Sequence, residues 1–236
     1  MKFLIYIFLL LIPISYSIGQ GLSGFELLKK SIEYHDPEGN WARFNESFSI
    51  VSSTPNKKDR TRVVYLNNSK GLFTMTSGIE PVVFYSISPE GIQVLLDGRS
   101  DISEEDKKKY RADEKGASMF RNYMTFLYGL PMKLLDPGTI IHSEVVDTVF
   151  FNIPSLRLKV TYEPEVGKDI WYFYFDKNDY SLKAYQFYHN ESKNDGEYIL
   201  LEKEAVFQNI RMPAVRTWYY NKDDKYLGTD TLKKSS

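Results

Sequence analysis

The stretch DIWYFYFDKNDYSLKAYQFYH, residues 169–189, decides the fold. Successive side chains of a β-strand point to opposite faces, so residues 170–175 have two apolar faces that both need cover. One face is Trp171, Phe173 and Phe175, and the other is Ile170, Tyr172 and Tyr174. Turn-forming residues follow at 176–179, and a second aromatic strand begins at Ser181. The stretch therefore predicts a β-hairpin within a larger antiparallel sheet.

The same alternation recurs on both sides of this hairpin, between turn residues such as Asn194-Asp-Gly196 and Asn221-Lys-Asp-Asp224. Further strands are expected at residues 44–50, 60–68, 71–77, 81–88, 91–98, 155–163, 197–207, 214–220 and 225–232. An aromatic content of 15%, with 18 Tyr and 15 Phe, also favours strands. The pattern predicts an antiparallel meander of roughly ten strands.

The first of two principal helices is expected to open at Ser23, which forms a capping box with Glu26. It ends in YHDPEGNW, residues 34–41, where DPEG has the residue types of a type I turn. We interpret this crowded segment as a helix end followed by a turn. Only His35 and Trp41 stay candidates for a site.

The second helix is expected to open near Ser103, to become apolar after Gly116, and to end at Gly129 and Pro131. The predicted fold is mainly β (α+β). It is a single strongly curved antiparallel sheet or half-barrel, with the two helices against its concave face. A sheet of that size needs its concave face filled, and whatever the helices leave uncovered is a cavity.

The first 20 residues predict a secretory signal peptide: Lys2 precedes an apolar run at residues 3–14, and small and polar residues follow. A membrane-spanning helix needs about 20 apolar residues, and no later segment offers them. The sequence has no cysteine, which excludes disulfides and lipid anchoring through cysteine, and fits a periplasmic protein. We expect a signal peptide at residues 1–20, cleaved after Ser17 or Gln20, and one soluble periplasmic domain at residues 21–236.

The charge and the motifs exclude several classes of function. The formal net charge is −1 without a basic stripe, so nucleic acid is not an expected partner. The GxGxxG pattern at residues 19–24 lacks a preceding strand, and the calcium-loop pattern from Asp176 lacks its glycine and its final acid. No metal or cofactor is expected, because the three histidines do not have metal-ligand spacing; they are His35, His142 and His189.

Several segments together resemble a family of uncharacterised exported proteins of Bacteroidota. They lie at residues 34–41, 127–139, 169–187, 196–202 and 211–232. That family is distantly similar to the periplasmic lipoprotein-carrier superfamily, with its lipoprotein-localisation-factor-like fold. The resemblance implies an incomplete β-barrel closed over by helices, with an apolar interior that accommodates acyl chains in the carriers. It supplies no catalytic residues.

Aromatic and methionine side chains make adaptable walls for apolar ligands, although any one of them also fits an ordinary core. The predicted ligand-binding residues are Phe120, Tyr123, Met124, Leu127, Trp171, Phe173, Phe175, Tyr185 and Phe187. The leading hypothesis is a non-enzymatic, monomeric periplasmic protein that binds an acyl chain, a lipid or a lipidated peptide. Two alternatives stay open. One is a periplasmic hydrolase using carboxylates or His35, and the other is a structural envelope protein that binds a protein partner through a sheet edge.

Overall fold

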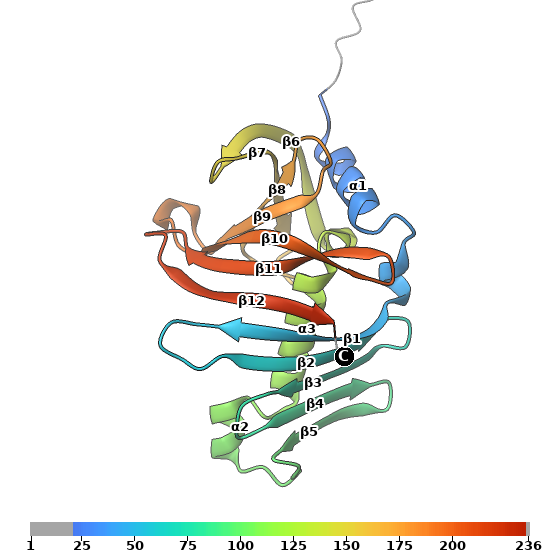
Figure 1. Ribbon diagram of the computed structural model, residues 1–236, viewed down its shortest axis with the longest axis vertical. Helices are drawn as coiled ribbons and strands as arrows, with labels where there is room; N and C mark the ends of the chain where they lie inside the picture. The colour runs from blue at the N-terminus through green and yellow to red at the C-terminus, as the bar shows by residue number, and fades with distance from the viewer. Residues whose placement is uncertain (1–20, 235–236) are drawn as a thin grey trace, which may run out of the picture.

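The computed structural model describes residues 21–234, which form one antiparallel sheet of 12 strands (Figure 1). The strand order is β5-β4-β3-β2-β1-β12-β11-β10-β9-β8-β7-β6. Strands that follow one another in the chain pair with each other, except β5 and β6, and the first strand, β1, also pairs with the last, β12. The sheet is not closed, since β5 and β6 are its two edges. The predicted signal peptide at residues 1–20 lies outside the described residues.

The predicted fold class is confirmed, and the sheet has 12 strands where roughly ten were expected. The strands are β1 (Asn45–Ser53), β2 (Arg60–Asn67), β3 (Leu72–Ser77), β4 (Val83–Ser88), β5 (Gly91–Leu96), β6 (Thr139–Phe150), β7 (Ile153–Tyr162), β8 (Ile170–Asp176), β9 (Leu182–Tyr188), β10 (Glu197–Phe207), β11 (Ile210–Tyr220) and β12 (Tyr226–Lys234). The sequence prediction missed β6, a strand at the edge of the sheet without a buried residue. Its side chains therefore lack the alternation that marks a half-buried strand.

The first helix, α1 (Gly24–His35), begins and ends as predicted. The Ser23 amide donates to the Glu26 carboxylate at 2.9 Å, and the Glu26 amide donates back to the Ser23 hydroxyl at 3.4 Å. After the helix, the Asp36 carboxylate accepts from the amides of Asn40 at 2.7 Å and Trp41 at 2.9 Å. These bonds hold the turn that stops the helix.

The prediction of one long second helix is wrong, because the segment folds as α2 (Glu104–Tyr110) and α3 (Glu114–Gly129). Arg111 ends α2 in the left-handed conformation, with φ 55°. The Asp113 carboxylate then accepts from the Gly116 amide at 2.7 Å and caps a new helix. Short 3-10 helices complete the fold at η1 (Asn40–Arg43), η2 (Met132–Leu135) and η3 (Glu191–Lys193).

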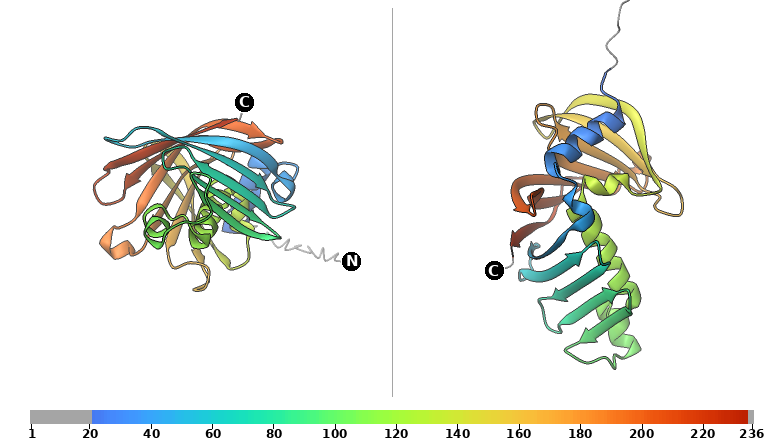
Figure 2. Two further views of the ribbon diagram at one scale, coloured as in Figure 1. Left: turned by 90° about the horizontal axis from the view of Figure 1, so that it is seen from below. Right: turned by 90° about the vertical axis from the view of Figure 1, so that its right-hand side faces the viewer.

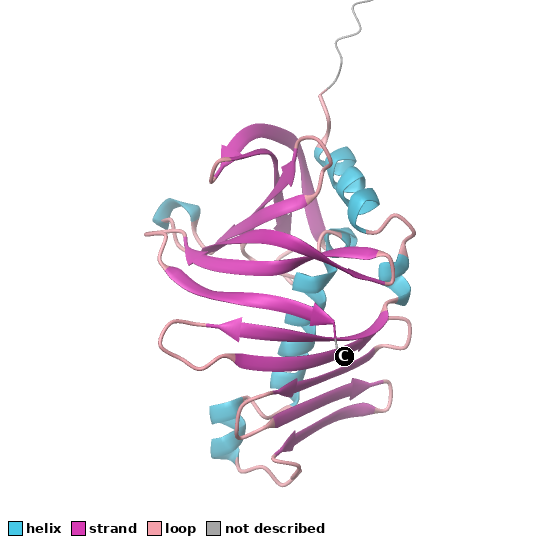
Figure 3. Cartoon of the chain, in the orientation of Figure 1, coloured by secondary structure: helices cyan, strands magenta, loops and turns pink. Residues whose placement is uncertain are grey.

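The two long helices cover different parts of the concave face (Figures 2 and 3). Helix α1 packs on β6, β7 and β11, whereas α3 packs on β4, β5 and β11. The start of α1 lies so close to β6 that a Cβ on Gly24 would sit 2.0 Å from the His142 carbonyl oxygen. No helix within residues 21–234 is long and apolar enough to cross a membrane.

Candidate ligand-binding cavity

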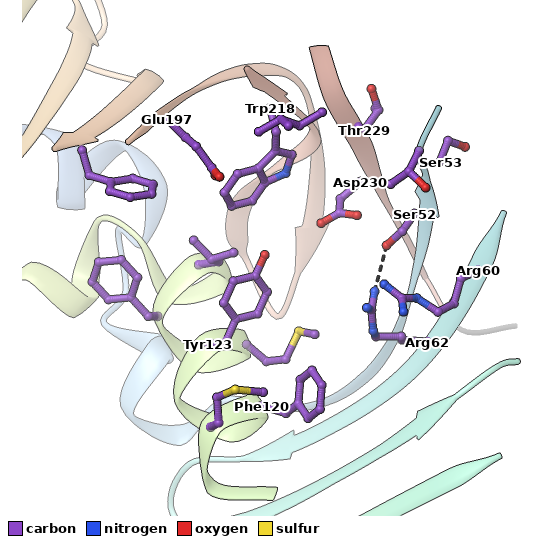
Figure 4. Close-up of a pocket in the computed structure, with 18 of the residues that line it drawn as sticks. Ser52, Ser53, Arg60, Arg62, Phe120, Tyr123, Glu197, Trp218, Thr229 and Asp230 are labelled. Carbon is purple, nitrogen blue, oxygen red and sulfur yellow. Dashed lines mark hydrogen bonds between the residues drawn. The ribbon is translucent and has the colours of Figure 1, made fainter. Parts of the chain in front are cut away.

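A cavity of about 700 Å3 opens between α3 and the concave face of the sheet (Figure 4). Three aromatic side chains recur along this side of α3, and each packs against an aromatic side chain of the sheet. The pairs are Phe120 with Tyr85 at 5.2 Å between ring centroids, Tyr123 with Trp218 at 6.4 Å, and Phe126 with Trp171 at 5.3 Å. The cavity therefore has a largely aromatic wall, to which Met119 and Met124 also belong.

The structure brings six of the nine predicted ligand-binding residues together on the cavity wall. These six are Phe120, Tyr123, Met124, Leu127, Trp171 and Phe187. The other three, Phe173, Phe175 and Tyr185, are at most 1% exposed and belong to the core beside the cavity. Contact of any of the nine with a ligand stays a prediction.

One end of the cavity carries arginines that the sequence prediction did not include. Arg60 and Arg62 alternate on β2, so both side chains point to the concave face, across from Tyr123 and Phe120 of α3 (Figure 4). Arg62 donates to the buried Ser52 hydroxyl at 2.9 Å. The Nε of Arg60 is buried and has no hydrogen-bond partner within residues 21–234. Burial and the neighbouring Arg62 lower the pKa of Arg60.

A row of directly paired residues continues from Arg60 across the sheet. Arg60 pairs with Ser52, Ser52 pairs with Asp230, and Asp230 pairs with Arg216, from β2 through β1 and β12 to β11. Directly opposite residues in antiparallel strands share a face, so Asp230 lies between Arg216 on one side and the neutral Ser52 and Arg60 on the other. Its last member, Arg216, is 1% exposed and is the largest fully buried side chain.

Arg216 ties α3 to the sheet from beneath the cavity. Its guanidinium donates to the carbonyl oxygens of Leu127 at 3.0 Å and Pro213 at 2.7 Å, and lies 4.1 Å from the ring centroid of Tyr128. Leu127 is in the last turn of α3, where carbonyl groups lack helical partners. The buried cation therefore completes the helix end and fixes one wall of the cavity.

The other end of the cavity is acidic. His189 Nδ1 and the Asp169 carboxylate lie 2.7 Å apart, and Glu197 on β10 faces the same space. The hydrogen bond to Asp169 raises the pKa of His189, while burial raises the pKa of Glu197. The cavity thus joins an arginine end and a carboxylate end along one aromatic wall.

His35, the histidine that the hydrolase hypothesis used, is not on the cavity wall. It is 1% exposed, and both ring nitrogens contact backbone groups: Nε2 accepts from the Leu182 amide at 2.9 Å, and Nδ1 lies 2.6 Å from the Arg211 carbonyl oxygen. Because a carbonyl only accepts, Nδ1 carries the proton and the ring is neutral. Burial lowers the pKa of His35. The two hydrogen bonds of the ring connect the end of α1 to β9 and β11. Neither ring nitrogen is therefore free for catalysis.

Trp41 also has a packing role. A Cβ on Gly129, the last residue of α3, would lie 2.3 Å from the Trp41 ring, so the indole rests directly on the helix end. Trp41 also packs on Phe44, with 5.3 Å between the centroids. The segment YHDPEGNW is therefore a structural junction between the two long helices.

No group of three or more histidines and carboxylates within residues 21–234 is placed to hold a metal ion. Sequence reasoning missed Arg60, Arg62, Trp218 and Asp230 as cavity residues. For the two arginines the signal present was their alternate spacing on β2, but a charged residue at such a position usually points to solvent.

The model of a protein family, described as a family of unknown function (DUF6503), matches residues 4–234. No curated protein sequence matches the chain. The structure is similar to a LolA superfamily protein from Nitrosomonas europaea, with a TM-score of 0.53, 9% identity, and coverage of 91% of this chain and 94% of that chain. This similarity confirms that the chain has a LolA-like fold.

Two further solved structures have lower TM-scores. One is a domain from Vibrio parahaemolyticus assigned to outer membrane lipoprotein sorting, with a TM-score of 0.40, 8% identity, and coverage of 90% of this chain and 92% of that chain. The other is a DUF1329 family protein from Desulfovibrio piger, with a TM-score of 0.44, 9% identity, and coverage of 89% and 90%.

Proposed function

Because the chain belongs to DUF6503, a family of unknown function, we propose its function from the cavity: it is a non-enzymatic protein that binds an apolar ligand. The ligand classes that fit are an acyl chain, a lipid and the lipid part of a lipidated peptide. The single observation that supports the proposal is the cavity of about 700 Å3 with its largely aromatic wall. Its volume is within the range of about 300–1,000 Å3 found for ligand sites.

The energetics favour an acyl chain over a small apolar solute. Each methylene group that leaves water contributes about 0.8 kcal/mol, so a chain that extends along three aromatic pairs accumulates several such contributions. The wall side chains are already partly wet, since Tyr123 is 42% and Met119 38% exposed. A ligand that covers them removes apolar surface from water on both sides of the contact.

We propose that the protein acts in the periplasm. The support is the signal peptide predicted at residues 1–20 together with the LolA-like fold, and the Bacteroidota origin stays a prediction from the sequence resemblance. A second protein that supplies or receives the ligand would be the expected partner, because a carried lipid has to enter and leave.

The direct test is native mass spectrometry of the exported protein purified from cells, followed by organic extraction. The expected result is a bound amphiphile that appears in the extract and raises the protein mass by its own mass. Protein that carries no lipid and also leaves fluorescent fatty-acid probes unbound would contradict the proposal. Co-purification of a protein partner without a small molecule would instead favour a structural envelope protein.

A variant pair locates the binding to this cavity. Trp171 and Trp218 line it, so a brominated fatty acid that binds there should quench tryptophan fluorescence. Phe126→Asp puts a charge into the aromatic wall. The affinity measured by quenching should fall about tenfold or more, because burying an unpaired carboxylate is costly. Phe25→Asp is the matched control, since Phe25 is an exposed helix phenylalanine on α1 outside the cavity. Equal binding by both variants would place the ligand elsewhere.

A hydrolase stays the second candidate because of one observation, the hydrogen bond between His189 and Asp169 at the acidic end of the cavity. A histidine oriented by a carboxylate is a common general base. Turnover of ester, glycoside or peptide substrates that is lost in His189→Ala would support this candidate. Turnover of none of these substrates by the unmodified protein would exclude these activities and leave the binding function.

A further inference from the structure

The arginine end of the cavity is preorganised for an anion. Ser52 is buried and holds the Arg62 guanidinium through a 2.9 Å hydrogen bond. Arg60 lies two residues along the same strand, so the two side chains are on the same face, roughly 7 Å apart at their Cα atoms. Two guanidiniums on the same face repel each other unless something negative lies between or above them.

The positive charge at this end is not neutralised by the protein. The carboxylate of the same paired row is Asp230, yet neither arginine forms an ion pair with it or with another described carboxylate. A third guanidinium, Arg111, lines the cavity beside Met119, with 3.3 Å between Nη1 and the sulfur. The three arginines outnumber Asp230, so an anion that entered here would meet a net positive charge.

One polar atom at this end also lacks a partner. The Arg60 Nε is buried without a hydrogen bond within the described part of the chain. A buried donor that leaves its hydrogen bond unmade costs free energy. A ligand oxygen or an ordered water above Arg60 would satisfy this donor.

We propose that the ligand is a single-chain amphiphile with an anionic head group, a carboxylate or a phosphate, bound by Arg60 and Arg62. This inference rests on the proposed function and specifies its ligand. The head group accepts hydrogen bonds from the two guanidiniums, which match carboxylate and phosphate oxygens in geometry. The tail extends past Phe120, Tyr123 and Phe126 toward Trp171.

The opposite end of the cavity fixes this orientation. Asp169, which is paired with His189, and Glu197, whose side chain forms no ion pair within residues 21–234, face the cavity there, beside Trp171 and Phe187. An anionic head at that end would meet carboxylates, whereas at the Arg60 end it meets guanidiniums. The two ends therefore differ in sign, and the amphiphile has one favourable direction of binding.

The test compares three probes of equal chain length by displacement of a brominated fatty acid: hexadecanoate, hexadecyl phosphate and hexadecanol. The unmodified protein should bind both anionic probes about tenfold or more tightly than the neutral alcohol, as expected for a charge-assisted hydrogen-bonded pair. The Arg60→Gln, Arg62→Gln double variant should lose this preference while its affinity for hexadecanol changes by about twofold or less. Inorganic phosphate alone should not compete.

Arg99→Gln is the matched control, since Arg99 is exposed after β5 and does not line the cavity. If the double variant unfolds, Arg60→Lys with Arg62→Lys keeps both charges and should keep the preference for anions. The three-probe comparison on the unmodified protein needs no variant at all.

The outcomes separate this inference from the proposed function. If hexadecanol binds as tightly as the anionic probes, or the double variant keeps the preference, the head-group site is wrong and the apolar cavity stands. Competition by inorganic phosphate alone would mean an anion site independent of the amphiphile and would also overturn the inference. If none of the three probes binds, the proposed function itself fails.

Discussion

The concave face of the sheet has two parts that differ in how they are filled. The part next to α1 is a packed core: Leu27 and Leu28 of the helix and Phe173 and Phe175 of β8 belong to one hydrophobic cluster and are all 0% exposed. Along α3 the aromatic side chains contact aromatic side chains of the sheet and also line the cavity. One sheet thus supports a packed core and a ligand-sized space, and the position of the covering helix decides which of them forms.

Strand β8 crosses from one part to the other within five residues. Trp171, Phe173 and Phe175 occupy alternate positions, but Trp171 lines the cavity while the other two are in the core. Their chemistry is alike and their surroundings are not. Substitutions on this strand therefore separate packing from binding, and they give the largest expected effects.

The first prediction compares Phe173→Ala with Phe187→Ala. Phe173 is fully buried, so its loss leaves a void and should lower the free energy of unfolding by about 3–5 kcal/mol. Phe187 lines the cavity, where water already reaches, and its loss should cost less than about 2 kcal/mol while weakening ligand binding. Urea unfolding of both variants measures this difference. Equal losses of stability would mean that the two parts are packed alike.

The second prediction concerns His35, the buried histidine whose hydrogen bonds connect the end of α1 to β9 and β11. His35→Phe keeps the ring but leaves the Leu182 amide and the Arg211 carbonyl without their partner, so the free energy of unfolding should fall by about 2–4 kcal/mol. His142→Phe is the control, because His142 is on the edge strand β6 and, among residues 21–234, its imidazole has one hydrogen bond, to the Thr161 hydroxyl at 3.0 Å. A loss below about 1 kcal/mol for His35→Phe would contradict this structural role of His35.

The third prediction probes the contact that places α3 beside the cavity. Replacing glycine by alanine inside a helix normally stabilises it by about 0.5–1 kcal/mol. At Gly129 the sign should reverse, with a loss of about 1–3 kcal/mol, because the new Cβ would lie 2.3 Å from the Trp41 ring. Thermal unfolding measures the change. A second substitution, Trp41→Ala, should remove most of the penalty, and additive effects would mean that the two residues do not touch.

Local sequence signals predicted the hairpins and both ends of α1, because alternation, turn residues and the Ser23–Glu26 capping box act between near neighbours. They failed for one strand and for one helix break. Strand β6 was missed because it is an edge strand without a buried side chain. The break between α2 and α3 depends on Arg111 adopting a left-handed conformation, which is uncommon for arginine.

The candidate site was predictable only in part. The apolar residues of α3, β8 and β9 identified six cavity residues, but alternation alone cannot tell Trp171 from Phe173. That difference depends on how far each helix lies from the sheet. The inward direction of Arg60 and Arg62 was equally hidden, because it depends on the register of β2 with β1.

The last and smallest predicted effects concern two histidines: His35, in the packed part beside α1, and His189, which lines the cavity. Burial lowers the pKa of His35 below its usual 6.5, and the hydrogen bond to Asp169 raises the pKa of His189 above the same value. NMR titration of the imidazole protons should therefore give one midpoint on each side of about 6.5. Two midpoints near the unperturbed value would mean that neither environment acts as the structure indicates.

The two shifts affect stability with opposite signs. Below about pH 6.5, His35 takes up a proton in the unfolded chain but stays neutral in the folded protein, because its pKa is lowered there. Falling pH therefore favours the unfolded chain, and the contribution of His35 to the free energy of unfolding is lost. His189 stabilises the folded state while protonated, and this contribution is lost as pH rises through its raised pKa; it is small because the side chain is 63% exposed. Urea unfolding between about pH 5.5 and 7.5 should show that the free energy of unfolding falls toward acidic pH. This fall should be absent in His35→Phe. If the free energy of unfolding of His35→Phe falls toward acidic pH as much as that of the unmodified protein, another buried group is responsible and His35 is not the acid-sensitive residue.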